Sequence, residues 1–271
     1  MELFSLPENE TFLVLLNEPD NDPQSEALKA HFMNPEKFSF EYILSPIHLL
    51  SLAPATMLSG SMKERSDVSG SDGERIGAVI LAAGPSSRMG RPKQLLEYGG
   101  QTLARRAVRA ARAAGCKPVV IVTGAHAKEL NEELHGLNLR EANNPEWESG
   151  IGSSIRAGIQ AVVKANDKVT ALILMLCDQP FVTSDVLSGL IAAHREGGGE
   201  IVASSYGGTI GVPALFGKAF FAELVRLESG AGAKQVIQRH VTQVHLLPFP
   251  QGEIDLDTPA DFARLLSSSK S

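Results

Sequence analysis

Short apolar runs alternate with segments of helical period from Arg75 onward, and this alternation constrains the fold more than any other feature. The run over 170–176 is continuously apolar. Such a run indicates a strand buried on both faces, as in a parallel sheet covered by helices. Repeated strand–helix units imply right-handed crossovers. We therefore predict an α/β fold: a Rossmann-like, doubly wound, mostly parallel sheet in a three-layer α/β/α arrangement.

Individual elements follow from the same patterns. Strands are expected over 76–81, 118–122, 139–142, 170–176, 200–204 and 243–247. Helices are expected over 103–114, 127–134, 153–164, 184–195, 218–227, 231–240 and 259–266. Thr102 is a suitable N-cap for the first of these helices, and Gly115 is a suitable residue to end it. Together these elements place one domain over 75–268.

The first 75 residues differ from the rest of the chain in charge and composition. They hold 13 acidic and 5 basic side chains, so the chain's net charge of −6 arises in this segment. Residues 59–74 are polar and rich in Ser and Gly, which is typical of a flexible linker. Residues 1–58 are either an acidic extension or a small αβ appendage, with a strand over 11–16, a helix over 25–32 and a strand over 38–44.

Composition excludes several classes of protein. No apolar run reaches the ~18–20 residues of a membrane helix, and the acidic net charge argues against a general nucleic-acid binder. The two cysteines, Cys116 and Cys177, cannot form a disulfide framework or supply a structural zinc site. The beginning of the sequence lacks the features of a signal peptide. A cytoplasmic protein is the simplest interpretation.

The loop after the strand 76–81 carries the strongest chemical signal, because ligands of doubly wound sheets gather at the carboxyl ends of strands. Small residues at 82–84 let backbone N–H groups approach a ligand, and Ser86 and Ser87 add hydroxyls. Three cations suited to a triphosphate follow within six positions: Arg88, Arg91 and Lys93. The loop has neither a P-loop triplet nor a Gly-x-Gly-x-x-Gly fingerprint. A surface loop with solvated arginines is the alternative.

Acidic residues at two later positions could face this loop. Asp178 follows the buried strand 170–176, where a carboxylate could hold Mg²⁺ against substrate phosphates. It could equally begin a turn with Pro180. Asp255 and Asp257 share one face in extended backbone and could bind a cation together. The alternative for each is a capping role near the helix that begins at 259.

Five motifs, in this order, resemble the nucleotidyltransferases of molybdenum cofactor maturation, most closely the cytidylyltransferase branch. The resemblance covers about 76–266 and includes the related molybdopterin-guanine dinucleotide synthases. The motifs are the loop 81–93 with Gln94-Leu95-Leu96, the segment 144–154 (Asn-Pro-Glu-Trp-Glu-Ser-Gly-Ile-Gly-Ser-Ser), Cys177-Asp178-Gln179-Pro180, Gly211-Val212-Pro213-Ala214-Leu215-Phe216, and Asp255-Leu256-Asp257-Thr258-Pro259. The segment 1–75 lies outside the resemblance.

The resemblance implies a fold of the nucleotidyltransferase (glycosyltransferase-A-like) type and transfer of a nucleoside monophosphate to an acceptor phosphate, with release of pyrophosphate. It implies catalytic roles for Arg88, Lys93 and Asp178. Asp178 would hold Mg²⁺ with Asp257, or alternatively with Asp255. The nucleotide-binding residues would be Leu81, Ala82, Ala83, Gly84, Ser87, Asn144, Gly150 and Ser154. For the cytidylyl branch the substrates would be CTP and a molybdopterin-type acceptor, with a molybdenum hydroxylase as the partner that receives the product.

The nucleotide base and the acceptor are the least determined features. At the start of the loop the guanylyl branch looks like Leu-x-Gly-Gly, whereas this chain has Leu81-Ala82-Ala83-Gly84, with alanine at the third position. The extra methyl favours CTP over GTP. Three alternatives stay open: transfer from GTP, transfer to another acceptor such as a sugar phosphate, methylerythritol phosphate or phospholactate, and a non-catalytic protein that delivers the cofactor to a molybdenum hydroxylase.

Overall fold

The computed structural model describes residues 2–5, 11–14, 75–197 and 199–268. Contacts divide the chain into two units, 1–68 and 69–271. In the first unit, β1 (Glu2–Ser5) pairs antiparallel with β2 (Thr11–Val14), which corresponds to the strand expected over 11–16. The helix expected over 25–32, the strand over 38–44 and the linker over 59–74 lie outside the described residues.

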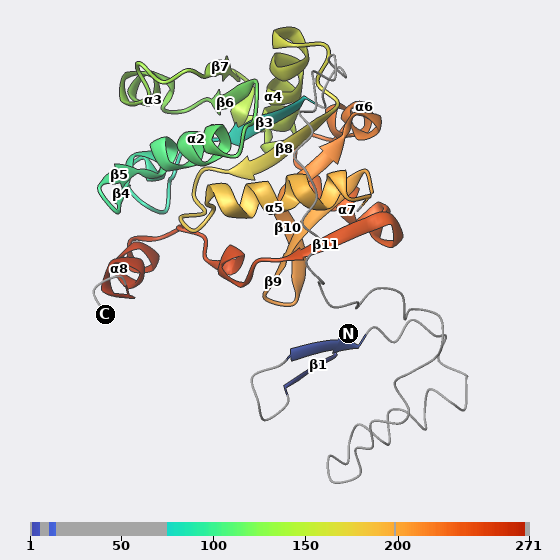
Figure 1. Ribbon diagram of the computed structural model, residues 1–271. Coiled ribbons are helices and arrows are strands. Elements are labelled where there is room, and N and C mark those ends of the chain that lie inside the picture. Colours follow the sequence, from blue (N-terminus) through green and yellow to red (C-terminus); the bar gives the residue numbers. More distant parts are fainter. Residues whose placement is uncertain (1, 6–10, 15–74, 198, 269–271) are drawn as a thin grey trace, which may run out of the picture. The chain divides into compact units, whose positions relative to one another are not determined.

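A seven-stranded sheet forms the centre of the second unit (Figure 1). Its strands are β3 (Ile76–Leu81), β6 (Val119–Thr123), β7 (Arg140–Asn143), β8 (Ala171–Leu176), β9 (Ile201–Tyr206), β10 (Thr209–Gly217) and β11 (Val244–Pro248). They lie in the order β11-β9-β10-β8-β3-β6-β7. β3 pairs in parallel with β6 on one side and with β8 on the other. The chain therefore winds outward in both directions from β3, which confirms the doubly wound, mostly parallel prediction.

The strand β10 was absent from the sequence prediction. It runs antiparallel to both of its neighbours, β8 and β9. Its sequence contains Gly211, Pro213 and Gly217, residue types that are depleted in strand interiors. The register with β9 shifts between Gly211 and Ala214, so a bulge accommodates the proline. The pattern of alternating strands and helices failed here because β9 and β10 are joined directly as a hairpin.

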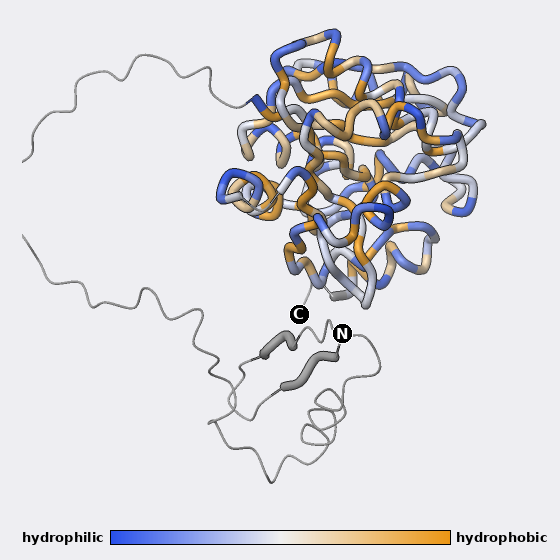
Figure 2. The backbone as a smooth tube through the Cα atoms, turned by 90° about the vertical axis from the view of Figure 1, so that its right-hand side faces the viewer, coloured by the Kyte–Doolittle hydropathy of each residue, from blue (hydrophilic) through white to orange (hydrophobic). Residues whose placement is uncertain are grey.

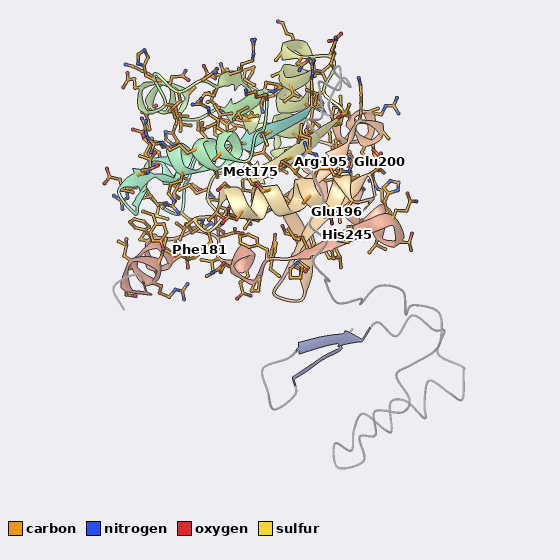
Figure 3. The ribbon with its side chains drawn as sticks, viewed as in Figure 1. Met175, Phe181, Arg195, Glu196, Glu200 and His245 are labelled. Atoms are coloured by element: carbon orange, nitrogen blue, oxygen red, sulfur yellow. The ribbon has the colours of Figure 1, made fainter. Side chains whose placement is uncertain are left out.

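Helices cover both faces of the sheet, which completes the three-layer arrangement. One buried cluster joins the sheet to α2 (Leu103–Ala113), α3 (Ala127–Glu133), α5 (Ser184–Arg195) and α8 (Pro259–Ser268). The other joins it to α4 (Ile151–Ala165), α6 (Phe221–Val225) and α7 (Ala233–Arg239). Along β3 the side chains alternate: Ile80 belongs to the first cluster and Val79 to the second. Met175 of β8 is fully buried in the first cluster, with residues of α5 (Figure 3).

Hydropathy follows this layering. In Figure 2 the hydrophobic segments gather inside the 75–268 part, and the hydrophilic ones lie mainly on its outer loops and helix surfaces. No helix among the described residues combines the length and the apolar character that crossing a bilayer requires.

Local signals fix most helix ends. The Thr102 side chain accepts a hydrogen bond from the Arg105 N–H, as expected of an N-cap, and Gly115 has a φ of 85° just past the end of α2. α4 begins two residues earlier than predicted, directly after Gly150. The helix expected over 218–227 is a 3₁₀ turn (Lys218–Phe220) followed by the short α6. The remaining elements are the hairpin β4–β5 (Glu97–Tyr98 and Gln101–Thr102) and short 3₁₀ turns at Lys93–Leu95, Trp147–Ser149, Val241–Gln243 and Pro250–Glu253.

Candidate functional site

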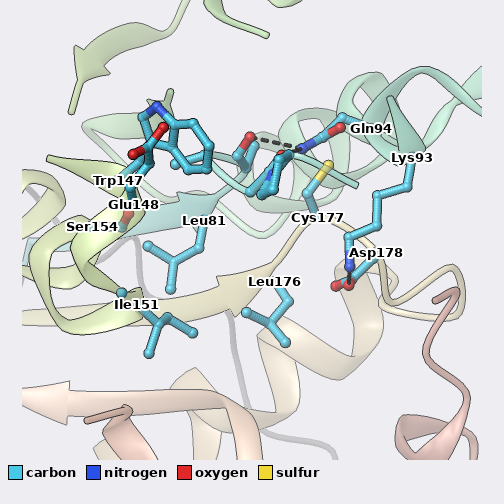
Figure 4. A pocket seen from close by; sticks show the side chains of 15 residues that line it. Leu81, Lys93, Gln94, Trp147, Glu148, Ile151, Ser154, Leu176, Cys177 and Asp178 are labelled. Carbon is cyan, nitrogen blue, oxygen red and sulfur yellow. Dashed lines mark hydrogen bonds and ion pairs between the residues drawn. The ribbon is translucent and has the colours of Figure 1, made fainter. Parts of the chain in front are cut away.

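A cavity of about 440 Å³ opens at the carboxyl ends of β3 and β8 (Figure 4). This is the position where doubly wound sheets bind ligands. The lining residues are Leu81, Ala82, Ala83, Gly84, Pro85, Lys93, Gln94, Trp147, Glu148, Gly150, Ile151, Ser154, Leu176, Cys177 and Asp178. Eight of the residues assigned from the sequence are among them: Leu81, Ala82, Ala83, Gly84, Lys93, Gly150, Ser154 and Asp178.

One wall of the cavity is the loop over 82–92, here called the first loop. Gln94 is 1% exposed, and its side-chain NH₂ donates to the carbonyl oxygens of Ala82 and Gly84, each at 2.9 Å. The Ser86 hydroxyl donates to Oε1 of Gln94 at 3.2 Å and accepts the Lys93 backbone N–H at 3.0 Å. The first half of the loop, residues 82–86, is therefore bound to the 3₁₀ turn that carries Lys93 and Gln94.

Ser87, which the resemblance placed at the nucleotide, is exposed and is not among the lining residues. Its neighbour Ser86 takes part in the hydrogen bonds of the first loop instead. Ser86 has a φ of 56°, a left-handed conformation that non-glycine residues rarely adopt. Since the two serines are adjacent and chemically identical, the sequence gives no signal that separates them.

The predicted cations and acids meet beside the cavity, although they lie far apart in the chain. The Lys93 ammonium donates to the Asp178 carboxylate and lies 3.3 Å from Oδ1 of Asp257. Arg88 donates to the other oxygen of Asp257 at 2.9 Å. We call Arg88, Lys93, Asp178 and Asp257 the charge cluster. Asp257 and Arg88 do not line the cavity; Asp257 contacts the lining Lys93, and Arg88 contacts Asp257.

Burial controls the strength of these ion pairs. The side chains of Lys93 and Asp178 are 21% and 11% exposed, whereas that of Arg88 is 68% exposed. Burial opposes the charged form of Lys93, but the carboxylates of Asp178 and Asp257 outweigh it and raise the pKa of the ammonium. Lys93 is therefore a permanent cation at neutral pH, and the exposed Arg88 pair contributes little to stability.

Asp255 differs from Asp257 in its partners. It makes no hydrogen bond or ion pair within the described part of the chain, whereas Asp257 bonds both cations. Desolvation of Asp255, together with the negative charges of Asp178 and Asp257, raises the pKa of its carboxyl to about 6. Asp257 is therefore the better-placed second acid, and Asp255 is the carboxylate whose charge is least compensated.

The two acids of the charge cluster would bind a magnesium ion only if substrate phosphates and water supplied the remaining ligands. Among the described residues, no group of three or more His, Cys, Asp or Glu side chains is arranged to hold a metal. Asp178 and Asp257 do reach one common cation, the Lys93 ammonium. Mg²⁺ is commonly held by one or two carboxylates plus substrate phosphates and water. A pair of carboxylates that converges on one cation beside a cavity meets this requirement.

The opposite wall comes from the turn before α4. Asn144 is buried, is not a lining residue, and donates to the hydroxyls of Ser153 and Ser154 at 2.8 and 3.0 Å. Its side-chain oxygen accepts the Glu146 N–H at 3.0 Å. Asn144 thus orders the start of α4 from behind, while Ser154 and Gly150 line the cavity.

Trp147 and Cys177 also line the cavity and had no assigned role in the sequence. Trp147 packs on Gly124, where a Cβ would lie 2.8 Å from the indole Cγ and 2.7 Å from the Ala83 carbonyl oxygen. Figure 4 shows Trp147 on the side of the cavity opposite Lys93 and Asp178. Burial of Cys177 and the neighbouring Asp178 raise the pKa of its thiol, so this cysteine stays neutral.

A capping box holds Asp257 in place. Asp261 accepts hydrogen bonds from the Thr258 N–H at 2.8 Å and the Asp257 N–H at 3.3 Å, and its own N–H donates to the Thr258 hydroxyl at 3.3 Å. The hydrogen bonds from the Thr258 side chain and backbone lower the pKa of the Asp261 carboxyl to about 2. The carboxylate form is therefore the one that caps α8.

Replacing Asp261 with asparagine is expected to lower the melting temperature near pH 7, where the capping carboxylate is ionised. The folded-state pKa of about 2 lies below the ~3.9 of an unfolded aspartate, so this stabilisation is full above about pH 4 and is lost as the pH falls towards 2. Thermal melts of both proteins from pH 7 to pH 2 test this. A difference in melting temperature that stays constant down to pH 2 would contradict it.

Comparisons with known proteins agree with this geometry. A sequence model of the MobA-like NTP transferase domain matches residues 78–244. The chain is 39% identical over 120 residues to a nicotine blue oxidoreductase of Paenarthrobacter nicotinovorans, which is 44% of this chain and 57% of that protein. It is 35% identical over 129 residues to a probable molybdenum cofactor guanylyltransferase of Opitutus terrae, 47% of this chain and 59% of that protein. The chain thus spans somewhat more than half the length of these two relatives.

Two further similarities extend over more of the chain. A molybdenum cofactor cytidylyltransferase of Escherichia coli is 26% identical over 190 residues, which is 69% of this chain and 93% of that protein. The crystal structure of Rv0371c from Mycobacterium tuberculosis superposes with a TM-score of 0.61 at 30% identity, covering 72% of this chain and 98% of that one. A structure of Rv0371c in complex with manganese superposes with a TM-score of 0.60 at 28% identity.

The family match begins within β3, includes the first loop and Asp178, and ends at the start of β11. It covers more than half of the chain, and the fold superposes on that of the solved Rv0371c structure. The protein therefore belongs to the MobA-like NTP transferase family and is related to the molybdenum cofactor cytidylyl- and guanylyltransferases.

Proposed function

We propose that this chain transfers a cytidylyl group from CTP to the terminal phosphate of a small acceptor and releases pyrophosphate. A molybdopterin-type pterin phosphate is the first acceptor to test. The observation that carries the proposal is the charge cluster beside the cavity: two cations and two carboxylates from three distant segments stand at the end of a loop with closely approachable backbone. This combination suits a triphosphate and its magnesium ion.

The residues divide the work as follows. The cavity walls at 81–84 and at Gly150 and Ser154 would hold the base and ribose. Lys93 and Arg88 would leave their carboxylate partners for the phosphates, and Asp178 with Asp257 would hold Mg²⁺. A bound Mg²⁺ would neutralise charge on the phosphates during transfer. Lys93 would do the same from the protein, as an ammonium that is positioned before the substrate arrives.

The reaction needs no covalent intermediate on the protein. An oxygen of the acceptor phosphate attacks the α-phosphorus, a new P–O bond forms in line with the bond that breaks, and pyrophosphate leaves. The attacking phosphate is already ionised, so no general base is required. The neutral, buried Cys177 fits this scheme as a packing residue rather than a nucleophile.

The test is pyrophosphate release from purified protein with Mg²⁺, each of the four nucleoside triphosphates, and a panel of phosphorylated acceptors that includes molybdopterin, sugar phosphates, methylerythritol phosphate and phospholactate. Release with CTP and the pterin is expected. Pyrophosphate release with a different acceptor, and not with the pterin, would change the proposed acceptor but support nucleotidyl transfer. Protein that binds nucleotide but releases no pyrophosphate with any acceptor would contradict catalysis and favour the alternative of cofactor delivery to a molybdenum hydroxylase.

Turnover is expected to favour CTP over GTP, because Ala83 lines the cavity and carries a methyl group. At this position the pattern of the guanylyl branch, Leu-x-Gly-Gly, has glycine. One methyl group in a snug site is worth roughly tenfold in discrimination. The variant Ala83→Gly should bring the CTP-to-GTP ratio of kcat/KM closer to one by about that factor. A matched control is Ala114→Gly, at the C-cap of α2, which should leave the ratio unchanged. Equal or better use of GTP by the unmodified protein would contradict the base assignment.

A further inference from the structure

Gln94 has no role in the proposed chemistry, yet it is the most completely buried polar side chain that lines the cavity. We propose that Gln94 is a positioning residue for the nucleotide: by binding the carbonyls of the first loop, it aims that loop's free N–H groups at the ligand. The inference rests on the proposed function. It adds a residue that sets nucleotide affinity through the backbone of the first loop rather than by its own hydrogen bond to the nucleotide.

The peptide geometry of the first loop is the first step. The Ala82 carbonyl is held by Gln94, and the Ala83 carbonyl accepts the Ala125 N–H at 3.1 Å. Both peptides that follow are trans, so the N–H of Ala83 and the N–H of Gly84 point away from those two partners. Neither N–H donates to any atom of the described residues. Ala83 and Gly84 both line the cavity, so these two donors are available to a bound ligand.

The second step is the connection to Lys93. Oε1 of Gln94 accepts the Ser86 hydroxyl, and Ser86 in turn accepts the Lys93 N–H. One side chain therefore ties the backbone donors of the first loop to the lysine of the charge cluster. A side chain of equal size without hydrogen-bonding groups would leave the carbonyls of Ala82 and Gly84 without this donor and the Ser86 hydroxyl without this acceptor. Only the bond from the Lys93 N–H to Ser86 would then remain of this network.

The variant Gln94→Met keeps the volume and removes the three hydrogen bonds that the Gln94 side chain makes. We expect its dissociation constant for CTP to rise roughly tenfold to a hundredfold, since two ordered neutral donors at the ligand are disturbed. Maximal turnover should fall much less than affinity, because Asp178 and the Lys93 ammonium are retained. Ser86→Ala removes only the Ser86 part of the network and should raise the dissociation constant by a smaller factor.

Trp147 provides a direct readout of binding. It is the only tryptophan of the chain and lines the cavity, so a change in intrinsic fluorescence on titration with CTP and Mg²⁺ reports on this site. Two controls separate positioning from stability. Gln160→Met makes the same substitution at an exposed position of α4. Ser204→Ala removes the hydrogen bond from a fully buried hydroxyl to the Pro213 carbonyl and should lower the melting temperature without changing the CTP dissociation constant.

The outcomes are distinct. Weaker CTP binding by Gln94→Met and Ser86→Ala, with both controls at the affinity of the unmodified protein, is the expected result. Unchanged affinity in the folded fraction of both variants would overturn the inference while leaving the proposed function intact; Ser86→Ala supplies this answer even where Gln94→Met does not fold. Unmodified protein that binds none of the four nucleotides would overturn the inference and the proposed function together.

Discussion

Replacing Asp178 with asparagine is expected to lower the rate of pyrophosphate release by about 10²- to 10³-fold, the cost typical of removing one preorganised electrostatic group from an active site. The side chain keeps its size, so the loss would come from charge. Asparagine cannot balance the Lys93 ammonium, which Asp178 bonds in the absence of substrate, and it is a much weaker magnesium ligand than a carboxylate. Steady-state kinetics with CTP, Mg²⁺ and acceptor measure the effect.

Two companions make this prediction sharper. Asp185→Asn makes the same change at an exposed position in the first turn of α5 and should keep full activity. Lys93→Met should lose activity to a similar degree as Asp178→Asn. The double variant should lose much less than the product of the two single losses, because residues that act as one unit are not additive. Full activity in Asp178→Asn would exclude the charge cluster from catalysis.

The sequence predicted the sheet well where each strand was followed by its own helix. β3, β6 and β8 are apolar runs buried on both faces, and burial of this kind leaves a clear record in residue type. β10 escaped detection because its pairing partners are β8 and β9, and a proline and two glycines interrupt its pattern. The pairing of β10 with its neighbours depends on tertiary structure, which the periodicity of a short segment does not reveal.

The same contrast holds for the site. Lys93 and Asp178 could be assigned because a loop with three cations and an acid after a buried strand occur in the order that the family resemblance requires, and the structure brings the two side chains together. Gln94 could not, because its function depends on which carbonyls lie within reach, and those belong to Ala82 and Gly84, on the far side of a turn. Ser86 and Ser87 show most directly what the sequence could not predict. Their side chains are identical and adjacent, and only the structure shows that Ser86 bonds Gln94 and Lys93.

The start of α4 carries the largest expected effect on stability. The N–H of Gly152 donates to the Ser229 carbonyl at 2.8 Å, and a Cβ at Gly152 would lie 2.1 Å from the Glu228 carbonyl oxygen. Alanine normally stabilises a helix by about 1 kcal/mol over glycine. Here the obstacle is backbone, which cannot rotate aside, so the cost lies at the upper end of the ~1–3 kcal/mol that is typical of overpacking. The clash therefore outweighs the helix propensity, and Gly152→Ala should be destabilising by roughly 2 kcal/mol.

A loss of this size corresponds to a fall in melting temperature of roughly 4–8 °C for a domain of this length. Thermal melts should be compared with Gly230→Ala, in the segment that packs on α4, because a Cβ there meets no atom within 4 Å and its φ is not positive. That variant should melt near the temperature of the unmodified protein. Because Gly150 and Ser154 line the cavity on either side of Gly152, the folded fraction of Gly152→Ala should also bind CTP more weakly. If Gly152→Ala melted at the same temperature as Gly230→Ala, the segment 228–231 would have moved away from the new methyl group without loss of stability. The cavity wall before α4 would then not be rigid.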